Sequence, residues 1–144
     1  MKNTRQKYHR KIAEALEQHF PETAKTHPET LAYHFTESDL ADSEIPYWKI
    51  AGEIATRRSA NIEAVDHLTT ALELLKTLPD TSARDEQELL LHATLGPAWL
   101  AVKGYGSAEV GQTYTRAYEL CQRLGEPPQR RQRGRPEPRG RPRR

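Results

Sequence analysis

Apolar residues recur every three or four positions along most of the chain, which is the pattern of amphipathic helices. No stretch of useful length alternates between apolar and polar residues as a half-buried strand would. Isoleucine and valine are scarce while alanine and leucine are plentiful, which also favours helix. The predicted fold class is therefore all-α, with six helices at about 4–20, from Pro28, at about 43–59, 61–78, about 82–103 and 107–124.

Each predicted helix carries one apolar stripe and is too polar elsewhere to lie at the centre of a globule. The connections are three to seven residues long, so consecutive helices should be antiparallel neighbours. A stack of helical hairpins is the expected arrangement. The expected buried stripes are Ile12, Ala13, Leu16 and Phe20; Leu31, Ala32 and Phe35; Ile62, Val65, Leu68, Leu72 and Leu75; and Val110, Tyr114, Ala117, Cys121 and Leu124.

Turn and capping residues set the expected helix ends. Pro21 should stop the first helix, and Pro46 should lie in the first turn of the third. Gly96 and Pro97 should kink or interrupt the fifth helix, and Gly125 should close the sixth. The expected N-terminal caps are Asp42 or Ser43, Asn61, Ser82 (in a capping-box-like pair with Asp85) and Ser107.

Residues 45–78 match the 34-residue period of a tetratricopeptide repeat. Small residues at fixed positions let two antiparallel helices approach closely, while larger ones fill the space between them. Two positions depart from the pattern, because Ala55 is undersized and Lys76 stands where a proline is usual. Residues 90–124 resemble a degenerate second copy. The residues that carry the repeat signature are Trp48, Ala51, Gly52, Ala64, Leu68 and Ala71.

A narrower resemblance is carried by three stretches, TRQKYHRKIAEALEQHFPETA, LAYHFTESDLADSEIPYWKIAGEIATRRSANIEAVDHLTTALELLKTLPDT and LGPAWLAVKGYGSAEVGQTYTRAYELCQRLGE. Together they resemble the tetratricopeptide region of large bacterial signalling ATPases, multidomain proteins of the adenylate or guanylate cyclase type. The resemblance covers about residues 4–129 and implies a scaffold that follows a nucleotide-binding module and continues into further repeats. Because an arginine–proline tract begins at about Gln129, we expect this chain to be a fragment of such a protein.

Charge divides the chain into a body and a tail. Residues 127–144 hold eight arginines, five prolines and one acid, a net charge of +7. The other 126 residues hold 14 basic and 19 acidic residues, a net charge of −5. We therefore expect a repeat domain at 1–126 and a disordered tail at 127–144. Such a tail could bind phosphate backbones, which makes nucleic-acid or polyanion binding the alternative function.

The residues of common catalytic sites are missing or badly spaced. No Gly-rich loop ends in Lys-Ser or Lys-Thr, and no His-Glu-x-x-His places two imidazoles on one helix face. The single cysteine, Cys121, excludes an internal disulfide and is expected in the core. We therefore expect no enzymatic activity, no catalytic residues, no cofactor and no metal.

The predicted function is a non-catalytic scaffold that mediates protein–protein or interdomain contacts. In tetratricopeptide arrays the first helix of each hairpin lines the binding groove, and here it carries an exposed ridge at Lys49, Glu53 and Arg57. Those three residues are the candidate partner-binding face, and a solvated row of ion pairs is the alternative interpretation. No apolar run follows Met1, and none approaches the roughly 20 residues that cross a bilayer, so we expect a cytoplasmic protein without membrane contact.

Overall fold

The computed structural model describes residues 2–125, and this part of the chain is helical, without a strand. It confirms the all-α class for these residues, and none of their helices is long and apolar enough to cross a membrane. The predicted tail at 127–144 lies outside the described residues. The helices are α1 (Lys2–His19), α2 (Pro21–Thr26), α3 (Pro28–Glu37), α4 (Ala41–Arg57), α5 (Asn61–Leu75), α6 (Ser82–Lys103) and α7 (Ala108–Gly125).

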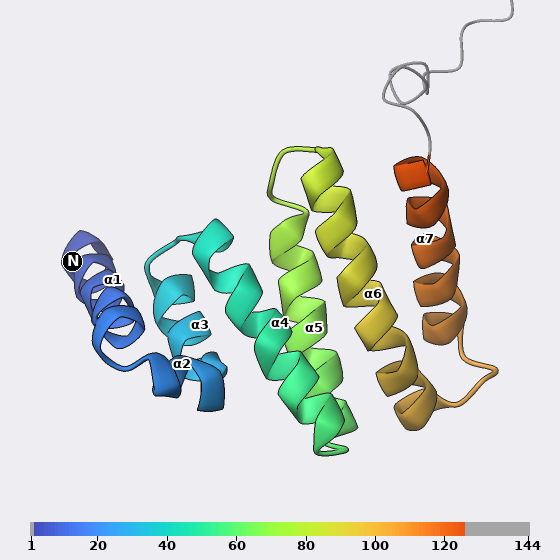
Figure 1. The fold of residues 1–144 in the computed structure, drawn as a ribbon, viewed down its shortest axis with the longest axis horizontal. Coiled ribbons are helices and arrows are strands. Elements are labelled where there is room, and N and C mark those ends of the chain that lie inside the picture. The colour runs from blue at the N-terminus through green and yellow to red at the C-terminus, as the bar shows by residue number, and fades with distance from the viewer. Residues whose placement is uncertain (1, 126–144) are drawn as a thin grey trace, which may run out of the picture.

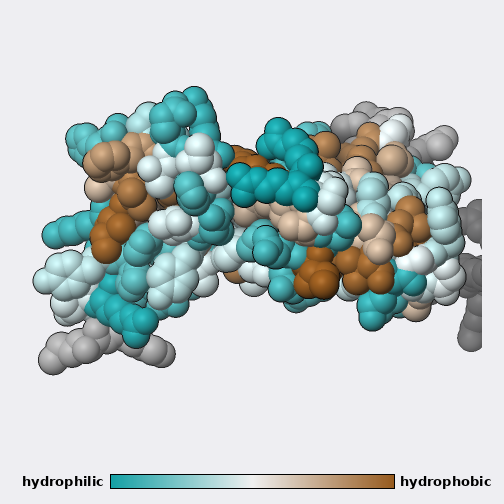
Figure 2. Space-filling model, turned by 90° about the horizontal axis from the view of Figure 1, so that it is seen from below, coloured by the Kyte–Doolittle hydropathy of each residue, from teal (hydrophilic) through white to brown (hydrophobic). Residues whose placement is uncertain are grey.

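The long helices stand side by side in chain order and alternate in direction, so the described chain forms an open row (Figure 1). Contacts join α1 to α3, α3 to α4, α4 to α5, α5 to α6, and α6 to α7, and α4 also touches α6. The short α2 packs on α1 and α3. Apolar side chains reach the surface in patches separated by hydrophilic ones (Figure 2). Each long helix is thus covered mainly by its neighbours in the chain.

A close helix contact lies in the hairpin of α4 and α5. A Cβ atom at Gly52 would lie 2.5 Å from Cγ of Leu68, so only glycine lets the two helices meet at this depth. Ala51, Ala64 and Ala71 are also buried there. Trp48 is half-buried, not fully buried as its place in the repeat predicts. Its ring stacks on the half-buried imidazole of His67 with 5.3 Å between centroids.

Buried apolar residues form one large cluster across α4, α5 and α6, which includes Leu68, Leu75, Leu91 and Leu95. Leu68 at 0% exposure and Leu75 at 1% are its most enclosed leucines on α5. Trp48 and Trp99 pack against the edges of the cluster. This cluster is the core that fixes the central helices.

A smaller cluster joins α1 to α3 through Ala13, Leu31 and Phe35. Polar contacts supplement it. Nδ1 of His9 lies 2.9 Å from Nδ1 of His34, and Arg5 pairs with Glu37 at 3.3 Å. The hydroxyl of Tyr47 on α4 donates a hydrogen bond to the carboxylate of Glu17 on α1.

Several predicted helix ends are displaced by a few residues. α4 begins at Ala41, so neither Asp42 nor Ser43 caps it, and Pro46 lies inside the helix beyond its first turn. α5 begins at Asn61, so the predicted cap is its first helical residue and makes no capping hydrogen bond. Pro21 opens α2 as well as ending α1, since its fixed φ suits a first helical turn.

The last two helices give a mixed result. Thr81, not Ser82, caps α6 by accepting a hydrogen bond from the Arg84 amide at 3.2 Å. α6 continues through Gly96 and Pro97, so these residues do not interrupt the helix, and the alternative of a kink stays a prediction. Ser107 does cap α7, because its hydroxyl accepts from the Val110 amide at 3.4 Å. Gly125 is the last residue of α7, and the described glycine with positive φ is Gly104, at 81°.

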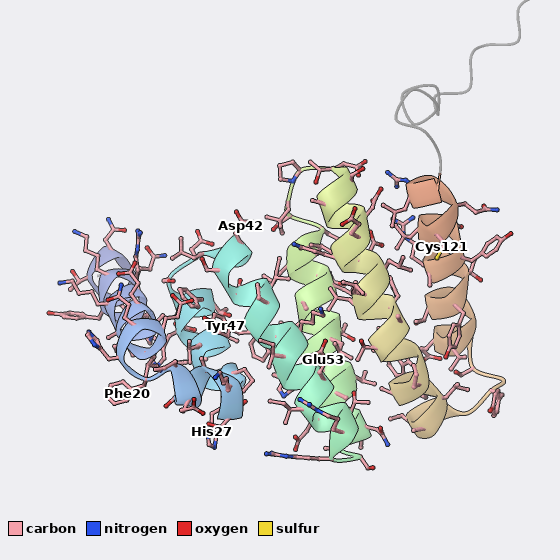
Figure 3. All side chains as sticks on the ribbon, viewed as in Figure 1. Phe20, His27, Asp42, Tyr47, Glu53 and Cys121 are labelled. Atoms are coloured by element: carbon pink, nitrogen blue, oxygen red, sulfur yellow. The ribbon has the colours of Figure 1, made fainter. Side chains whose placement is uncertain are left out.

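Parts of the predicted stripes face solvent. Ile62 is 72% exposed, and Phe20, at 59%, projects from the end of α1 (Figure 3). Ile12, Tyr114 and Cys121 are exposed as well. The predicted core position of Cys121 is therefore wrong, because α7 buries Leu120 in place of Cys121 and Thr113 in place of Tyr114. Its buried residues are Val110, Thr113 and Leu120.

Candidate functional site

The predicted ridge lies on α4, but it forms no cavity of its own. Nζ of Lys49 lies 3.6 Å from Oε1 of Glu53, and both side chains are partly exposed (Figure 3 labels Glu53). Such an i,i+4 pair contributes a few tenths of a kcal/mol. Arg57, the last residue of α4, is exposed and borders a shallow hollow with Lys25 and Arg58. The structure thus pairs two of the three predicted residues with each other.

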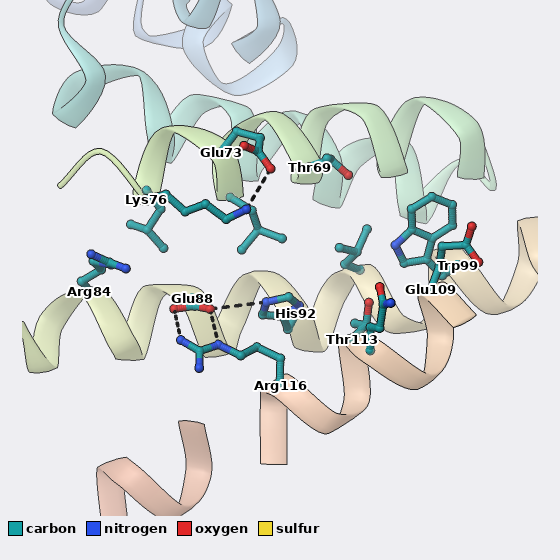
Figure 4. A pocket seen from close by; sticks show the side chains of 14 residues that line it. Thr69, Glu73, Lys76, Arg84, Glu88, His92, Trp99, Glu109, Thr113 and Arg116 are labelled. Atoms are coloured by element: carbon teal, nitrogen blue, oxygen red, sulfur yellow. Dashed lines mark hydrogen bonds and ion pairs between the residues drawn. The ribbon is translucent and has the colours of Figure 1, made fainter. Parts of the chain in front are cut away.

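A more enclosed site lies elsewhere, in a cavity of about 350 Å³ between α5, α6 and α7 (Figure 4). We call this cavity the three-helix groove. Each of its helices turns one stripe toward it, because residues three or four apart share a helix face. The apolar lining residues are Leu72, Leu75, Leu95 and Trp99, and the charged ones are Glu73, Lys76, Arg84, Glu88, Glu109 and Arg116.

A bidentate ion pair at the groove ties α6 to α7. Nε and Nη2 of Arg116 donate to the two carboxylate oxygens of Glu88 at 2.6 and 3.1 Å, and Nη1 lies 3.4 Å from Glu119. Burial alone would raise the pKa of Glu88, but the Arg116 guanidinium, with help from His92 and Arg84, holds that pKa below its usual range. Glu88 is therefore ionised at neutral pH and neutralises Arg116.

His92 lies one turn beyond Glu88, with Nε2 3.7 Å from its Oε1. Burial lowers the pKa of His92 and outweighs the nearby Glu88 carboxylate, which acts to raise it. The imidazole is therefore neutral at pH 7. The middle of the groove consequently holds a neutral histidine beside a neutralised ion pair.

Three polar atoms around the groove are buried without a hydrogen-bond partner among the described residues. They are Oγ1 of Thr69, Nε of Arg84 and Nδ1 of His92. Buried polar groups in folded proteins nearly always have a partner, so such a cluster calls for an explanation. All three residues line the same cavity.

Two charged groups of the groove form no ion pair within the described chain, and they lie at opposite ends. Arg84 donates Nη1 to the carbonyl of Leu78 at 2.8 Å but meets no carboxylate within ion-pair distance. Glu109, in the first turn of α7, has no cationic partner either. Figure 4 shows Arg84 at one end of the groove and Glu109 beside Trp99 at the other. By contrast, Lys76 pairs with Glu73 at 3.0 Å.

The lining residues include charged, hydrogen-bonding and apolar side chains, which are the groups through which proteins bind ligands. Among residues 2–125, no three His, Cys, Asp or Glu side chains gather in a way that could hold a metal ion. Cys121 lies exposed on α7 and does not line the groove. The sequence contained one sign of this site, the i,i+4 series Arg84, Glu88 and His92, but it did not reveal which residues of α5 and α7 face that series.

Comparison with known proteins found sequence similarity to part of a much longer protein. An uncharacterized protein of Rhizobium meliloti (strain 1021) is 28% identical over 123 residues, which is 85% of this chain. The chain spans 12% of the length of that protein. No protein-family model and no solved structure matches the chain.

Proposed function

We propose that residues 2–125 are a non-catalytic helical scaffold of the tetratricopeptide type, which holds a partner protein or a neighbouring domain. The observation that carries the proposal is the open row of alternating helices with a lined groove between three of them. Repeat arrays stack hairpins so that each unit contacts its neighbours and the array keeps extended binding surfaces. The close approach of Gly52 to Leu68 supports the same family of folds.

The match to a small part of a long relative fits a region that works within a larger protein. We therefore propose that this scaffold serves a multidomain signalling protein of the ATPase or cyclase type, as the sequence resemblance implies. Its own task in that setting would be contact between parts, without turnover of a substrate and without a cofactor. The groove is the proposed contact site, and the ridge of Lys49, Glu53 and Arg57 is the competing one.

Selection from a random peptide library displayed on phage tests the scaffold and separates the two sites. Enriched peptides, resynthesised and titrated calorimetrically into the full chain, should bind at one saturable site. Leu72→Glu in the groove should abolish this binding, whereas Lys49→Glu on the ridge should leave it unchanged. The reverse pattern would move the site to the ridge. The absence of any saturable peptide would count against the scaffold function itself.

The charge division of the sequence favours one second candidate, polyanion binding by residues 127–144, which carry a net charge of +7. Retention on a heparin column should then fall steeply with salt and vanish when residues 127–144 are removed. Retention that survives this truncation would exclude the tail as the binding element.

A further inference from the structure

The length of the three-helix groove limits what can occupy it. Arg84 and Trp99 both lie on α6 and line the groove, 15 residues apart. At 1.5 Å per residue they are separated by about 22 Å along the helix axis. An extended peptide covers that length in six or seven residues, at about 3.3 Å each. The cavity of about 350 Å³ holds several side chains but not a helix of about 10 Å diameter, so an extended occupant fits.

One end of the groove favours a carboxylate. Arg84 is half-buried and forms no contact-distance ion pair among the described residues. Its charge acts on Glu88 from farther away, and its Nη1 donates to the Leu78 carbonyl. Guanidinium groups bind carboxylates through parallel hydrogen bonds, and partial burial strengthens the attraction. An acidic side chain of the occupant would supply the missing partner.

The opposite end favours a cation. The Glu109 carboxylate has no cationic partner in the described chain and shares this end of the groove with Trp99 (Figure 4). An ammonium group placed there would meet a carboxylate and an aromatic face together. The helix dipole favours an acidic residue such as Glu109 in the first turn of α7. The dipole does not explain why Trp99 lines the same end of the groove.

The middle of the groove favours an apolar side chain. Leu72 and Leu95 line it, His92 is neutral, and the Glu88–Arg116 pair is internally compensated. An apolar side chain can therefore enter without leaving a charge unpaired. Thr69 and His92 also line the groove, and one polar atom of each is buried without a hydrogen-bond partner among the described residues.

We infer that the three-helix groove binds an extended peptide segment of six or seven residues that carries an acidic side chain at the Arg84 end, an apolar one in the middle and a basic one at the Trp99–Glu109 end. This inference rests on the proposed scaffold function and adds the chemistry and charge order of the partner segment.

Four blocked peptides on the full chain test the charge order by isothermal titration calorimetry at low salt. Two of them, EVTLVTK and KVTLVTE, carry one charge of each sign in the two chain directions, and EVTLVTE and KVTLVTK carry like charges. At least one mixed-charge peptide should bind five- to tenfold more tightly than either like-charge peptide. Equal affinities for all four, or no binding because water alone fills the groove, would overturn the inference.

Variants that reverse the charge at one end of the groove give the decisive test, since an unfolded variant could not gain affinity for a peptide. The Arg84→Glu variant should bind KVTLVTK most tightly, and the Glu109→Lys variant should bind EVTLVTE most tightly. Each ratio of affinities should be about the same as that with which the native chain prefers the mixed-charge peptide. Arg58→Glu, an exposed control outside the groove, should change none of the preferences. If library-selected peptides need the groove but ignore charge order, this inference fails while the scaffold function stands. If no library peptide binds either, both fail.

Discussion

The central helices α4 to α6 and the N-terminal helices α1 to α3 are held together by different means. The central helices share one continuous apolar cluster, in which alanines and Gly52 let leucines interlock. In the N-terminal region only Ala13 of the described α1 side chains is fully buried, and its partners are Leu31 and Phe35 of α3. Polar pairs such as Arg5–Glu37 complete that contact.

The difference shows what small residues contribute to a row of helices. Where Gly52 and Ala64 lie at a helix crossing, backbones approach and large side chains are enclosed from both sides. Where the crossing is built by longer polar residues, hydrogen bonds replace apolar burial, and each exposed pair contributes at most about 1 kcal/mol. The central helices should therefore determine global stability, and the N-terminal helices should open locally.

The largest expected effect comes from Leu68→Ala, which removes a completely buried side chain from the central cluster. The free energy of unfolding should fall by about 2–5 kcal/mol, measured by urea denaturation followed by circular dichroism. Ile62→Ala on the same helix is the matched control, since Ile62 faces solvent and its loss should cost less than about 0.5 kcal/mol. Equal losses at both positions would contradict the assigned orientation of α5.

The next effect concerns the close approach itself. Gly52→Ala should cost about 1–3 kcal/mol, because the new methyl group collides with Leu68. Combining it with Leu68→Ala should cost less than the sum of the two single changes, since the shortened side chain makes room. Gly111→Ala on α7 is the control, because its Cβ meets no atom within 4 Å, and it should be neutral or stabilising. Additive losses in the double variant would exclude the collision.

A subtler contrast should appear in hydrogen exchange of the native chain. Amides of residues 5–16 in α1 should exchange before those of residues 48–75, because α1 docks on a small cluster. Residues 110–122 of α7 should also exchange before residues 48–75, since α6 is the one long helix with which α7 makes an extensive contact among the described residues. Mass spectrometry of peptic fragments resolves the order. Uniform protection from α1 to α7 would show that the row opens as one unit.

The smallest effect compares one histidine in each region. Burial lowers the pKa of His34 on α3, with the neighbouring His9 acting in the same direction, and burial also lowers the pKa of His92 on α6. Just below pH 6.5 the unfolded chain therefore binds protons that the folded chain excludes, so stability falls as the pH drops through this window.

Urea midpoints measured between pH 7.5 and 5.5 test this sign. His34→Gln and His92→Gln should each flatten the decline, and the double variant should flatten it most. A decline of the same steepness in the native chain and in the double variant would contradict the lowered pKa values of the two imidazoles.

The sequence patterns predicted six of the described helices in their order but not the short α2, because apolar periodicity indicates a buried face only over several turns. They placed helix ends less well, since Asp42, Asn61 and Ser82 all have capping side chains and the choice between adjacent residues depends on how the chain enters the helix. The exposure of Ile62 was missed because a stripe of apolar residues does not show where the neighbouring helix stops covering it.

The candidate site was less predictable than the fold. The ridge of Lys49, Glu53 and Arg57 follows from the spacing within one helix, and the structure shows two of its members paired with each other. The groove brings together Arg84 and Glu109, which are 25 positions apart and belong to different helices. Their roles depend on which charges remain unpaired after the helices pack, and no local pattern contains that information.

The row of helices also gives the chain a definite response to force. Because each long helix contacts mainly its chain neighbours, tension applied at the two ends loads those contacts in series. The contact between α1 and α3 is the smallest between consecutive long helices and should part first. The 18 residues of α1, about 27 Å long as a helix, would then draw out to about 60 Å. The interlocked α4–α5 hairpin should yield last, so the chain would extend in steps rather than rupture at once.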